Sequence, residues 1–287
     1  MKIVLILLTL PLACLFLQSN AQNRYPSIGI ATSMDNDSLA YANGFVYLEE
    51  TVKKLLSPAV NDSVFESNLL KIRKMKCRLE TCNVFIPGQI KLVGPAVNEE
   101  KVLEFVEQVM QRAQKAGIRL IVLGSGDARR LPEGVNAAAA RSSFIPLGRK
   151  MAEIARKYNC LIAMENLNST ETNFVNKLTD AYAIASAINH PNFMVTADIY
   201  HMLKEGESPL SIEQAKDRLV HCHIAEKELR TAPGVAGDDF RPYFRALKKA
   251  GYQGRIMMEC RWDDPARQYK PALTYLETQL KEAYDAR

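Results

Sequence analysis

Histidine and tryptophan are scarce in this sequence of 287 residues, which contains four histidines and a single tryptophan. So few imidazoles argue against a metal cluster that needs many histidine ligands. Cysteines number six, and no pair has the C-x-x-C spacing of zinc ribbons and redox motifs. The five that follow Cys14 are an odd number, so we expect most of them to be small core residues rather than disulfide partners.

A basic cluster is also missing. The net charge of +5 comes from lysines and arginines scattered along the chain, without the interleaved aromatic residues that track a phosphate backbone. We therefore expect no nucleic-acid partner. The stretch GSGD at 124–127 lacks the third glycine of a dinucleotide fingerprint, so it is interpreted as a turn.

Long apolar runs are absent except near the N-terminus, where Lys2 precedes an apolar run over residues 3–17. Ser19 and Ala21 then occupy the −3 and −1 positions of a signal-peptidase site. Residues 1–21 are therefore predicted to be a signal peptide of an exported, periplasmic protein. The alternative is a lipoprotein anchored through Cys14. Because the run is shorter than the about 20 apolar residues that cross a bilayer, no membrane span is expected after cleavage.

Short β-rich runs alternate with longer amphipathic stretches over the rest of the chain, which is typical of β/α units around a parallel sheet. The predicted strands are 27–31, 45–49, 77–86, 118–124, 161–166, 193–198, 219–225 and 255–260. Apolar residues at three- and four-residue spacing predict helices over 65–76, 98–117, 142–159, 178–189, 210–218, 238–251 and 265–286. This order predicts an α/β fold with a single (β/α)8 TIM barrel over residues 22–287, with an open doubly wound sheet as the alternative.

Side chains that can bind a metal close the last four predicted strands: Glu165, Asp198, His223 and Glu259. Each acidic residue taken alone could be a helix N-cap or a solvated rim group. The C-terminal ends of barrel strands converge on one mouth, however, and crowded carboxylates are costly unless a cation offsets them. One divalent metal is therefore expected, with Mn²⁺, Co²⁺ or Mg²⁺ favoured and Zn²⁺ or Ni²⁺ allowed by the mixed oxygen and nitrogen ligands.

Other polar residues lie close to this set in the sequence. His201 follows Asp198 by three residues and is expected on a loop, either facing the substrate or bonded to backbone at the rim. His221 points to the same strand face as His223 but one layer deeper, as a supporting or core histidine. In the segments 83–98 and 124–143, which are expected to face the mouth, Asn83, Asp127 and Arg129 could reach the substrate, although loop solvation is the favoured interpretation.

The motifs MENLN, TADIYHM, HCHIAEK and MMEC, between 164 and 260, resemble in order and spacing the xylose-isomerase-like sugar phosphate isomerase/epimerase superfamily. This superfamily includes the ketose 3-epimerases and the family-2 AP endonucleases. The resemblance covers nearly the whole chain after the predicted signal peptide. It implies that Glu165, Asp198, His223 and Glu259 are the metal ligands, and that Glu165 and Glu259 are also the catalytic acid/base pair. It assigns substrate contacts to His201, Glu171 and Arg230.

These residues suit proton abstraction beside a carbonyl, because a metal that holds a carbonyl and a neighbouring hydroxyl acidifies the C–H between them. The sequence therefore predicts an exported, metal-dependent sugar isomerase or epimerase that works through an enediolate. A 3-keto-glycoside lyase or hydrolase would begin with the same enolisation and then eliminate the aglycone. A non-catalytic sugar-binding barrel is the alternative from another class. The partner is a small sugar or keto-glycoside, and the resemblance allows a homo-oligomer.

Overall fold

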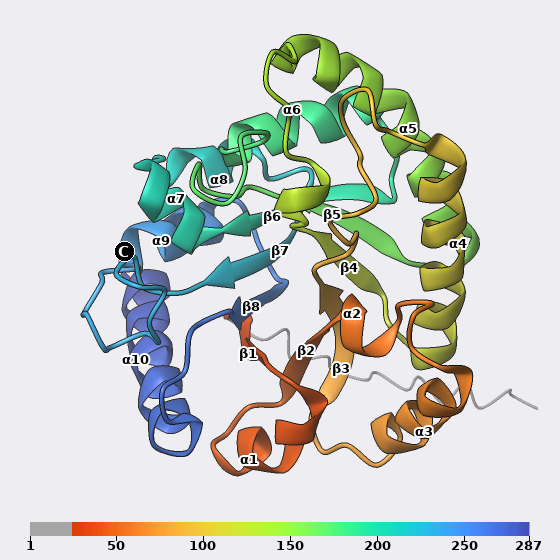
Figure 1. Ribbon diagram of the computed structural model, residues 1–287. Helices are drawn as coiled ribbons and strands as arrows, with labels where there is room; N and C mark the ends of the chain where they lie inside the picture. Colours follow the sequence, from red (N-terminus) through yellow and green to blue (C-terminus); the bar gives the residue numbers. More distant parts are fainter. Residues whose placement is uncertain (1–24, 287) are drawn as a thin grey trace, which may run out of the picture.

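The computed structural model describes residues 25–286, and within them eight parallel strands form a closed barrel in sequence order (Figure 1). The first and last strands pair with each other, with Ile28 opposite Ile256 and Ile30 opposite Met258. The strands are β1 (Ser27–Ala31), β2 (Tyr47–Thr51), β3 (Arg78–Asn83), β4 (Leu120–Leu123), β5 (Leu161–Glu165), β6 (Phe193–Asp198), β7 (Leu219–Ile224) and β8 (Arg255–Met258). The predicted (β/α)8 barrel is therefore confirmed.

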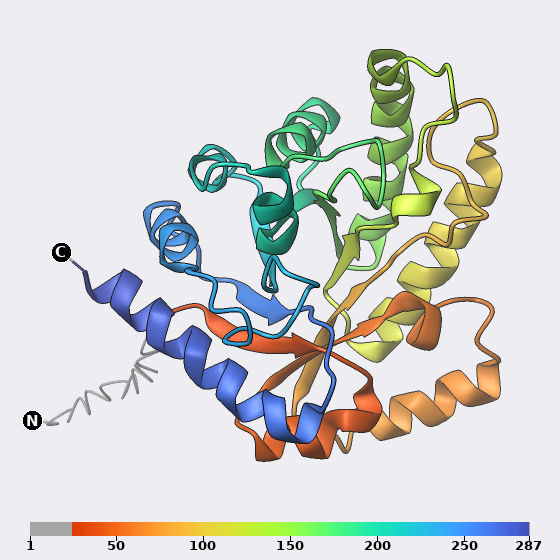
Figure 2. The same ribbon diagram turned by 60° about the vertical axis from the view of Figure 1, so that its left-hand side comes forward.

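Helices surround the ring of strands, and Figure 2 shows the long ones standing on the outside of the barrel. They are α1 (Asp37–Ala42), α2 (Val52–Leu55), α3 (Asp62–Ile72), α4 (Glu99–Ala116), α5 (Ala137–Lys157), α6 (Leu178–Ile188), α7 (Ile199–Glu205), α8 (Leu210–Gln214), α9 (Arg241–Lys249) and α10 (Pro265–Asp285). No helix of the described residues is long and apolar enough to cross a membrane. The predicted signal peptide, including Cys14, lies outside the described residues.

Buried apolar side chains divide into two clusters. The larger one lies between strands and helices, as expected for strands that are covered on the outside by amphipathic helices. A small one, with Leu120, Val122 and Ala163, fills part of the barrel interior. Higher in the same interior the inward-facing residues are polar, with Glu49, Thr196 and His221 all buried. The barrel is thus sealed by apolar residues low down and becomes polar toward the C-terminal ends of its strands.

Several element boundaries differ from the sequence prediction for local physical reasons. Strand β3 stops at Asn83 because Val84 adopts a left-handed φ of 52° that ends the extended backbone. Helices α3 and α5 begin earlier than predicted, because the Asn61 and Asn136 side chains cap them by accepting backbone N–H bonds. The short helices α1, α2 and α7 were not predicted, since fewer than eight residues give little periodicity.

The cysteines behave as the odd count suggests. The five within the described residues are free, and Cys77, Cys82, Cys160 and Cys222 are buried. Burial raises the pKa of Cys160 to about 12, so its thiol stays protonated at neutral pH. These residues therefore pack as small apolar side chains.

Candidate metal and active site

Four consecutive strands deliver the predicted ligands to one point at the mouth of the barrel. Glu165 and Asp198 are the last residues of β5 and β6, His223 lies one residue before the end of β7, and Glu259 directly follows β8. One ligand atom from each lies within 4.8 Å of those from the other three. His223 Nδ1 is 2.6 Å from Glu165 Oε1, 3.4 Å from Glu259 Oε2 and 4.0 Å from Asp198 Oδ2.

Burial makes this cluster electrostatically demanding. It raises the pKa values of Glu165 and Asp198, whose charges are poorly solvated. For Glu259 burial acts in the same direction, but Arg230 and His223 outweigh it and lower the pKa to about 2. The pKa of His223 is raised despite its burial, because Glu49, Glu165 and Glu259 favour the imidazolium. The cluster therefore attracts positive charge from several sides.

The donor set fits a single divalent cation. Asp198 Oδ2 is buried and has no hydrogen-bond partner within residues 25–286, which leaves a carboxylate oxygen available for a ligand. Three carboxylates and one imidazole are hard to intermediate ligands, as Mn²⁺, Mg²⁺ and Co²⁺ prefer, and no thiolate lies among them.

Asp198 has a second task, because it is also the N-cap of α7. Its Oδ1 accepts the backbone N–H of His201 at 3.1 Å, while Oδ2 points into the site. His201 consequently lies in the first turn of a helix, and its predicted place on a loop is wrong. The strand leads directly into the helix because the aspartate that ends β6 satisfies an N–H group that would otherwise be unpaired.

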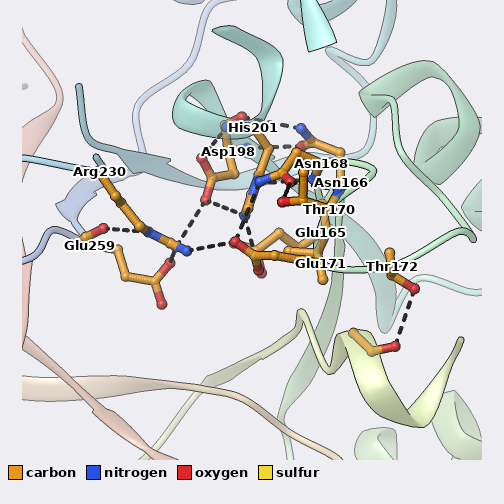
Figure 3. A network of polar contacts seen from close by, with 12 residues as sticks. Glu165, Asn166, Asn168, Thr170, Glu171, Thr172, Asp198, His201, Arg230 and Glu259 are labelled. Carbon is orange, nitrogen blue, oxygen red and sulfur yellow. Dashed lines mark hydrogen bonds and ion pairs between the residues drawn. The ribbon is translucent and has the colours of Figure 1, made fainter. Parts of the chain in front are cut away.

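His201 is completely buried beside this cluster (Figure 3). Its Nδ1 accepts the backbone N–H of Asn168 at 3.0 Å, and burial lowers its pKa to about 4, so the ring is neutral. Nε2 then carries the proton, lies 4.0 Å from Glu171 Oε2, and has no hydrogen-bond partner within the described chain. The backbone bond that sequence reasoning offered as an alternative to substrate contact is therefore present, and it leaves Nε2 as a donor facing the site.

Arg230 reaches the same space from the loop after β7. Figure 3 shows its guanidinium between the carboxylates of Glu259 and Glu171. Nη2 is hydrogen-bonded to Glu259 Oε2, and Nη1 lies 3.2 Å from Glu171 Oε1. The guanidinium also stacks over the Tyr200 ring, 4.7 Å from its centroid. The three residues predicted to contact substrate, His201, Glu171 and Arg230, thus border the ligand cluster on one side.

The amino-acid pattern of the xylose isomerase-like TIM barrel family matches residues 66–279. The chain belongs to this family. Among related xylose isomerase-like barrels, L-ribulose 3-epimerase from Methylomonas sp. (strain DH-1) is 32% identical over 120 residues, which is 42% of each chain. Ketose 3-epimerase from Arthrobacter globiformis is 31% identical over 128 residues, or 44% of each chain. The matched segments therefore span less than half the length of these relatives.

Solved structures share the fold over most of the chain. A D-psicose 3-epimerase determined in the presence of D-fructose superposes with a TM-score of 0.78 at 18% identity, covering 88% of this chain and 99% of that one. The 3-keto-D-glucoside 4-epimerase from E. coli gives 0.75 at 21% identity, covering 88% and 99%. At these identities the likeness concerns the xylose isomerase-like barrel itself.

Glu49 of this xylose isomerase-like site was not recognised in the sequence, and solvation was favoured over a site contact for Asn83. Glu49 on β2 is buried, and its Oε1 lies 2.7 Å from His223 Nε2. Asn83, predicted to be solvated, is buried at the end of β3 and donates to Glu259 Oε1 at 2.7 Å. Both belong to the first half of the barrel, where the strand ends do not each carry a metal-binding side chain as β5 to β8 do. Their position at strand ends was the available signal.

Arg129 was also expected to be solvated, and this is wrong. It is 1% exposed and donates from Nη2 to the backbone carbonyl of Glu165 at 2.6 Å. Nearby, Gly124 leaves room for the same residue, since a Cβ added there would lie 2.3 Å from Glu165 Oε2. Arg129 and Gly124 therefore fix the position of Glu165 from its backbone and from its side chain.

Proposed function

We propose that this protein is an exported, divalent-metal-dependent sugar epimerase or isomerase that exchanges a proton on a carbon next to a carbonyl. The observation that carries the proposal is the convergence of two glutamates, Glu165 and Glu259, with Asp198 and His223 in one buried cluster. The two relatives with similar sequences, both sugar 3-epimerases, support the same reaction class.

Glu165, Asp198, His223 and Glu259 would hold the metal, with Mn²⁺, Co²⁺ or Mg²⁺ favoured over Zn²⁺ and Ni²⁺. When bound, such an ion supplies Lewis acidity to a substrate carbonyl and the adjacent hydroxyl, which acidifies the C–H between them. Glu165 and Glu259 project from β5 and β8, which are separated by two intervening strands. One carboxylate removes the proton from one face of the substrate, and the other delivers a proton to the opposite face.

The neighbouring polar groups would orient the sugar. Nε2–H of His201 donates to a substrate oxygen, because the ring is neutral and its Nδ1 is already occupied by Asn168. Glu171 and Arg230 offer an acceptor and a donor next to it. Tyr200 holds the guanidinium of Arg230 in place by stacking. These contacts would help to hold the reacting carbon between the two glutamates.

A 3-keto-glycoside lyase or hydrolase would use the same first step, since removal of the proton beside a ketone also precedes β-elimination. The two activities differ in what leaves. An epimerase returns the proton and retains every substituent, whereas a lyase releases the aglycone. Product analysis therefore separates them within one experiment.

The first experiment measures metal content by mass spectrometry on untagged protein without residues 1–21, and compares the wild type with an Asp198→Ala/His223→Ala variant. About one metal per chain in the wild type and none in the variant is the expected result. Asp217→Ala, an exposed aspartate before β7, is the matched control and should keep the metal. Metal in neither protein after Mn²⁺, Co²⁺ or Zn²⁺ is supplied would contradict the proposal and favour a sugar-binding barrel.

The metal-loaded protein is then incubated with ketoses and 3-keto-glycosides in D₂O. Incorporation of one deuterium at a carbon next to the carbonyl is expected, and it should disappear in Glu165→Gln and Glu259→Gln. Release of an aglycone together with deuterium would identify the lyase. A wild-type protein that binds metal and sugar without any exchange would contradict catalysis.

A further inference from the structure

Glu49 connects the two halves of the barrel through its interior. It lies on β2, whereas the two side chains that it contacts lie on β7, and β1 and β8 separate these strands in the ring. One carboxylate oxygen lies 2.7 Å from His223 Nε2, and the other lies 2.9 Å from His221 Nε2. Glu49 is 1% exposed. Its carboxylate therefore stands between two imidazoles, deeper in the barrel than the ligand cluster.

Burying a glutamate in a barrel interior costs desolvation free energy, and branched apolar side chains usually fill this position. Each carboxylate oxygen of Glu49 faces an imidazole nitrogen, at 2.7 Å and 2.9 Å, so the side chain is placed as an acceptor. The fold therefore carries a buried charge here whose contacts are two histidine rings.

The two nitrogens of His223 face different partners. Nε2 faces Glu49, and Nδ1 faces the three carboxylates of the ligand cluster, with Glu165 Oε1 at 2.6 Å and Glu259 Oε2 at 3.4 Å. A ring that donates Nε2–H to Glu49 keeps the lone pair of Nδ1 for a cation. Histidine ligands of metals commonly donate their other N–H to a carboxylate, which fixes the ring and strengthens the ligand.

We propose that Glu49 is a positioning residue that holds His223 with Nε2 protonated and Nδ1 directed at the divalent cation. His221 supports this contact from the other carboxylate oxygen and keeps Glu49 from turning away. The inference rests on the proposed metal site, and it adds a residue from the first half of the barrel to a ligand set that otherwise comes from β5 to β8.

The chain supplies a matched control in the next residue. Glu50 is also buried, at 2% exposed, but its side chain points to the other face of β2, where it accepts the backbone N–H of Met34 at 2.9 Å and that of Thr51 at 2.8 Å. Glu50→Gln removes a buried carboxylate of the same strand without touching His223. This variant shows how far the loss of any buried carboxylate on β2 affects stability and metal binding.

The test is titration of the apo protein with Mn²⁺, followed by electron paramagnetic resonance of the free ion. Glu49→Ala should weaken Mn²⁺ binding by about 10- to 100-fold, as for other carboxylates that support a histidine ligand. Glu49→Gln should lose less, because its amide oxygen can still accept Nε2–H. Glu50→Gln should bind as the wild type does. Equal affinity in wild type and Glu49→Ala would overturn the inference.

A second measurement keeps the inference testable if Glu49→Ala does not fold. In the Zn²⁺-loaded wild type labelled with ¹⁵N-histidine, nuclear magnetic resonance should show Nδ1 of His223 coordinated and a downfield Nε2 proton. Glu49→Gln should move that proton upfield, since a neutral acceptor binds it more weakly. Coordination through Nε2 would overturn the inference. If the wild type binds no cation at all, the proposed metal site itself fails, which the titration distinguishes.

Discussion

The backbone of Arg230 is strained, and strain of this kind is common among residues of functional sites. Leu229 and Arg230 have consecutive left-handed φ angles of 52° and 57°. A left-handed φ at a residue other than glycine costs about 1 kcal/mol or more of conformational free energy. The contacts of the Arg230 guanidinium with Glu259, Glu171 and the Tyr200 ring offset this cost. The strain and these contacts together fix the guanidinium at the edge of the ligand cluster.

Replacing Arg230 by lysine keeps the charge but removes the planar fork that binds two carboxylates at once. We expect kcat/KM for deuterium exchange to fall about 10- to 100-fold, which corresponds to about 1.5–3 kcal/mol for hydrogen bonds to charged groups. The measurement is exchange kinetics on the best ketose of the screen. Arg261→Lys, in an exposed neighbour, should leave the rate unchanged. A normal rate in Arg230→Lys would show that charge alone suffices.

At the scale of elements, the loop between β7 and α9 is organised by one buried glutamate. Glu226 is fully buried, and its carboxylate accepts backbone N–H groups of Gly234 at 2.7 Å, Gly237 at 2.9 Å and Asp238 at 3.3 Å, as well as that of Ala236. The loop that carries Arg230 is thereby tied to the end of β7. This side chain acts together with backbone contacts, among them the bridge between Thr231 and Arg261.

Glu226→Ala should leave these buried donors without a partner, which costs about 1–3 kcal/mol of unfolding free energy. Chemical denaturation measures the loss. Hydrogen exchange should show faster exchange at residues 234–238, with the strands of the barrel unaffected. Glu228→Ala is the matched control, because Glu228 is exposed in the same loop. Uniform loss of protection through the barrel would contradict a local role for Glu226.

The strands, the long helices and the ligand cluster could be predicted from the sequence because each shows a repeated physical pattern. Periodicity located the strands and the long helices, and the acidic or imidazole residues at four strand ends pointed to the ligand cluster. Glu49 was missed because a glutamate in a strand resembles one that faces solvent, and its inward direction depends on the register of β2 in the closed ring. Arg129 was missed for a similar reason, since loop composition does not reveal burial.

At the scale of the whole molecule, we expect the buried ligand cluster to lower the free energy of unfolding of the metal-free protein. Burial raises the pKa of Asp198, so its charged form is unfavourable without a cation. Asp198→Asn keeps the oxygen that caps α7 and the size of the side chain, and gives up an attraction to Arg230 at 3.7 Å. We expect the apo variant to be more stable than the apo wild type by about 0.5–2 kcal/mol, as for other functional-site substitutions.

Thermal unfolding with and without Mn²⁺ measures this difference in stability. The wild type should gain melting temperature as Mn²⁺ is added, because a ligand that binds the native state stabilises it by mass action. Asp198→Asn should start higher and gain little. A lower melting temperature for the apo variant would show that the carboxylate stabilises the fold on its own.

The pairing of β1 with β8 gives the ligand cluster a place in the order of folding. Glu259 directly follows β8, which pairs with the strand of His223, so these two residues can meet before the ring closes. Glu49 belongs to β2, so it cannot meet His223 until β1 and β8 have come together. Contacts between such distant segments form late and slowly, because the entropy of closing long loops must first be overcome. The part of the metal affinity that depends on Glu49 therefore reports completion of the ring, and ring closure in a refolding chain can be timed by the moment at which it reaches full affinity for the ion.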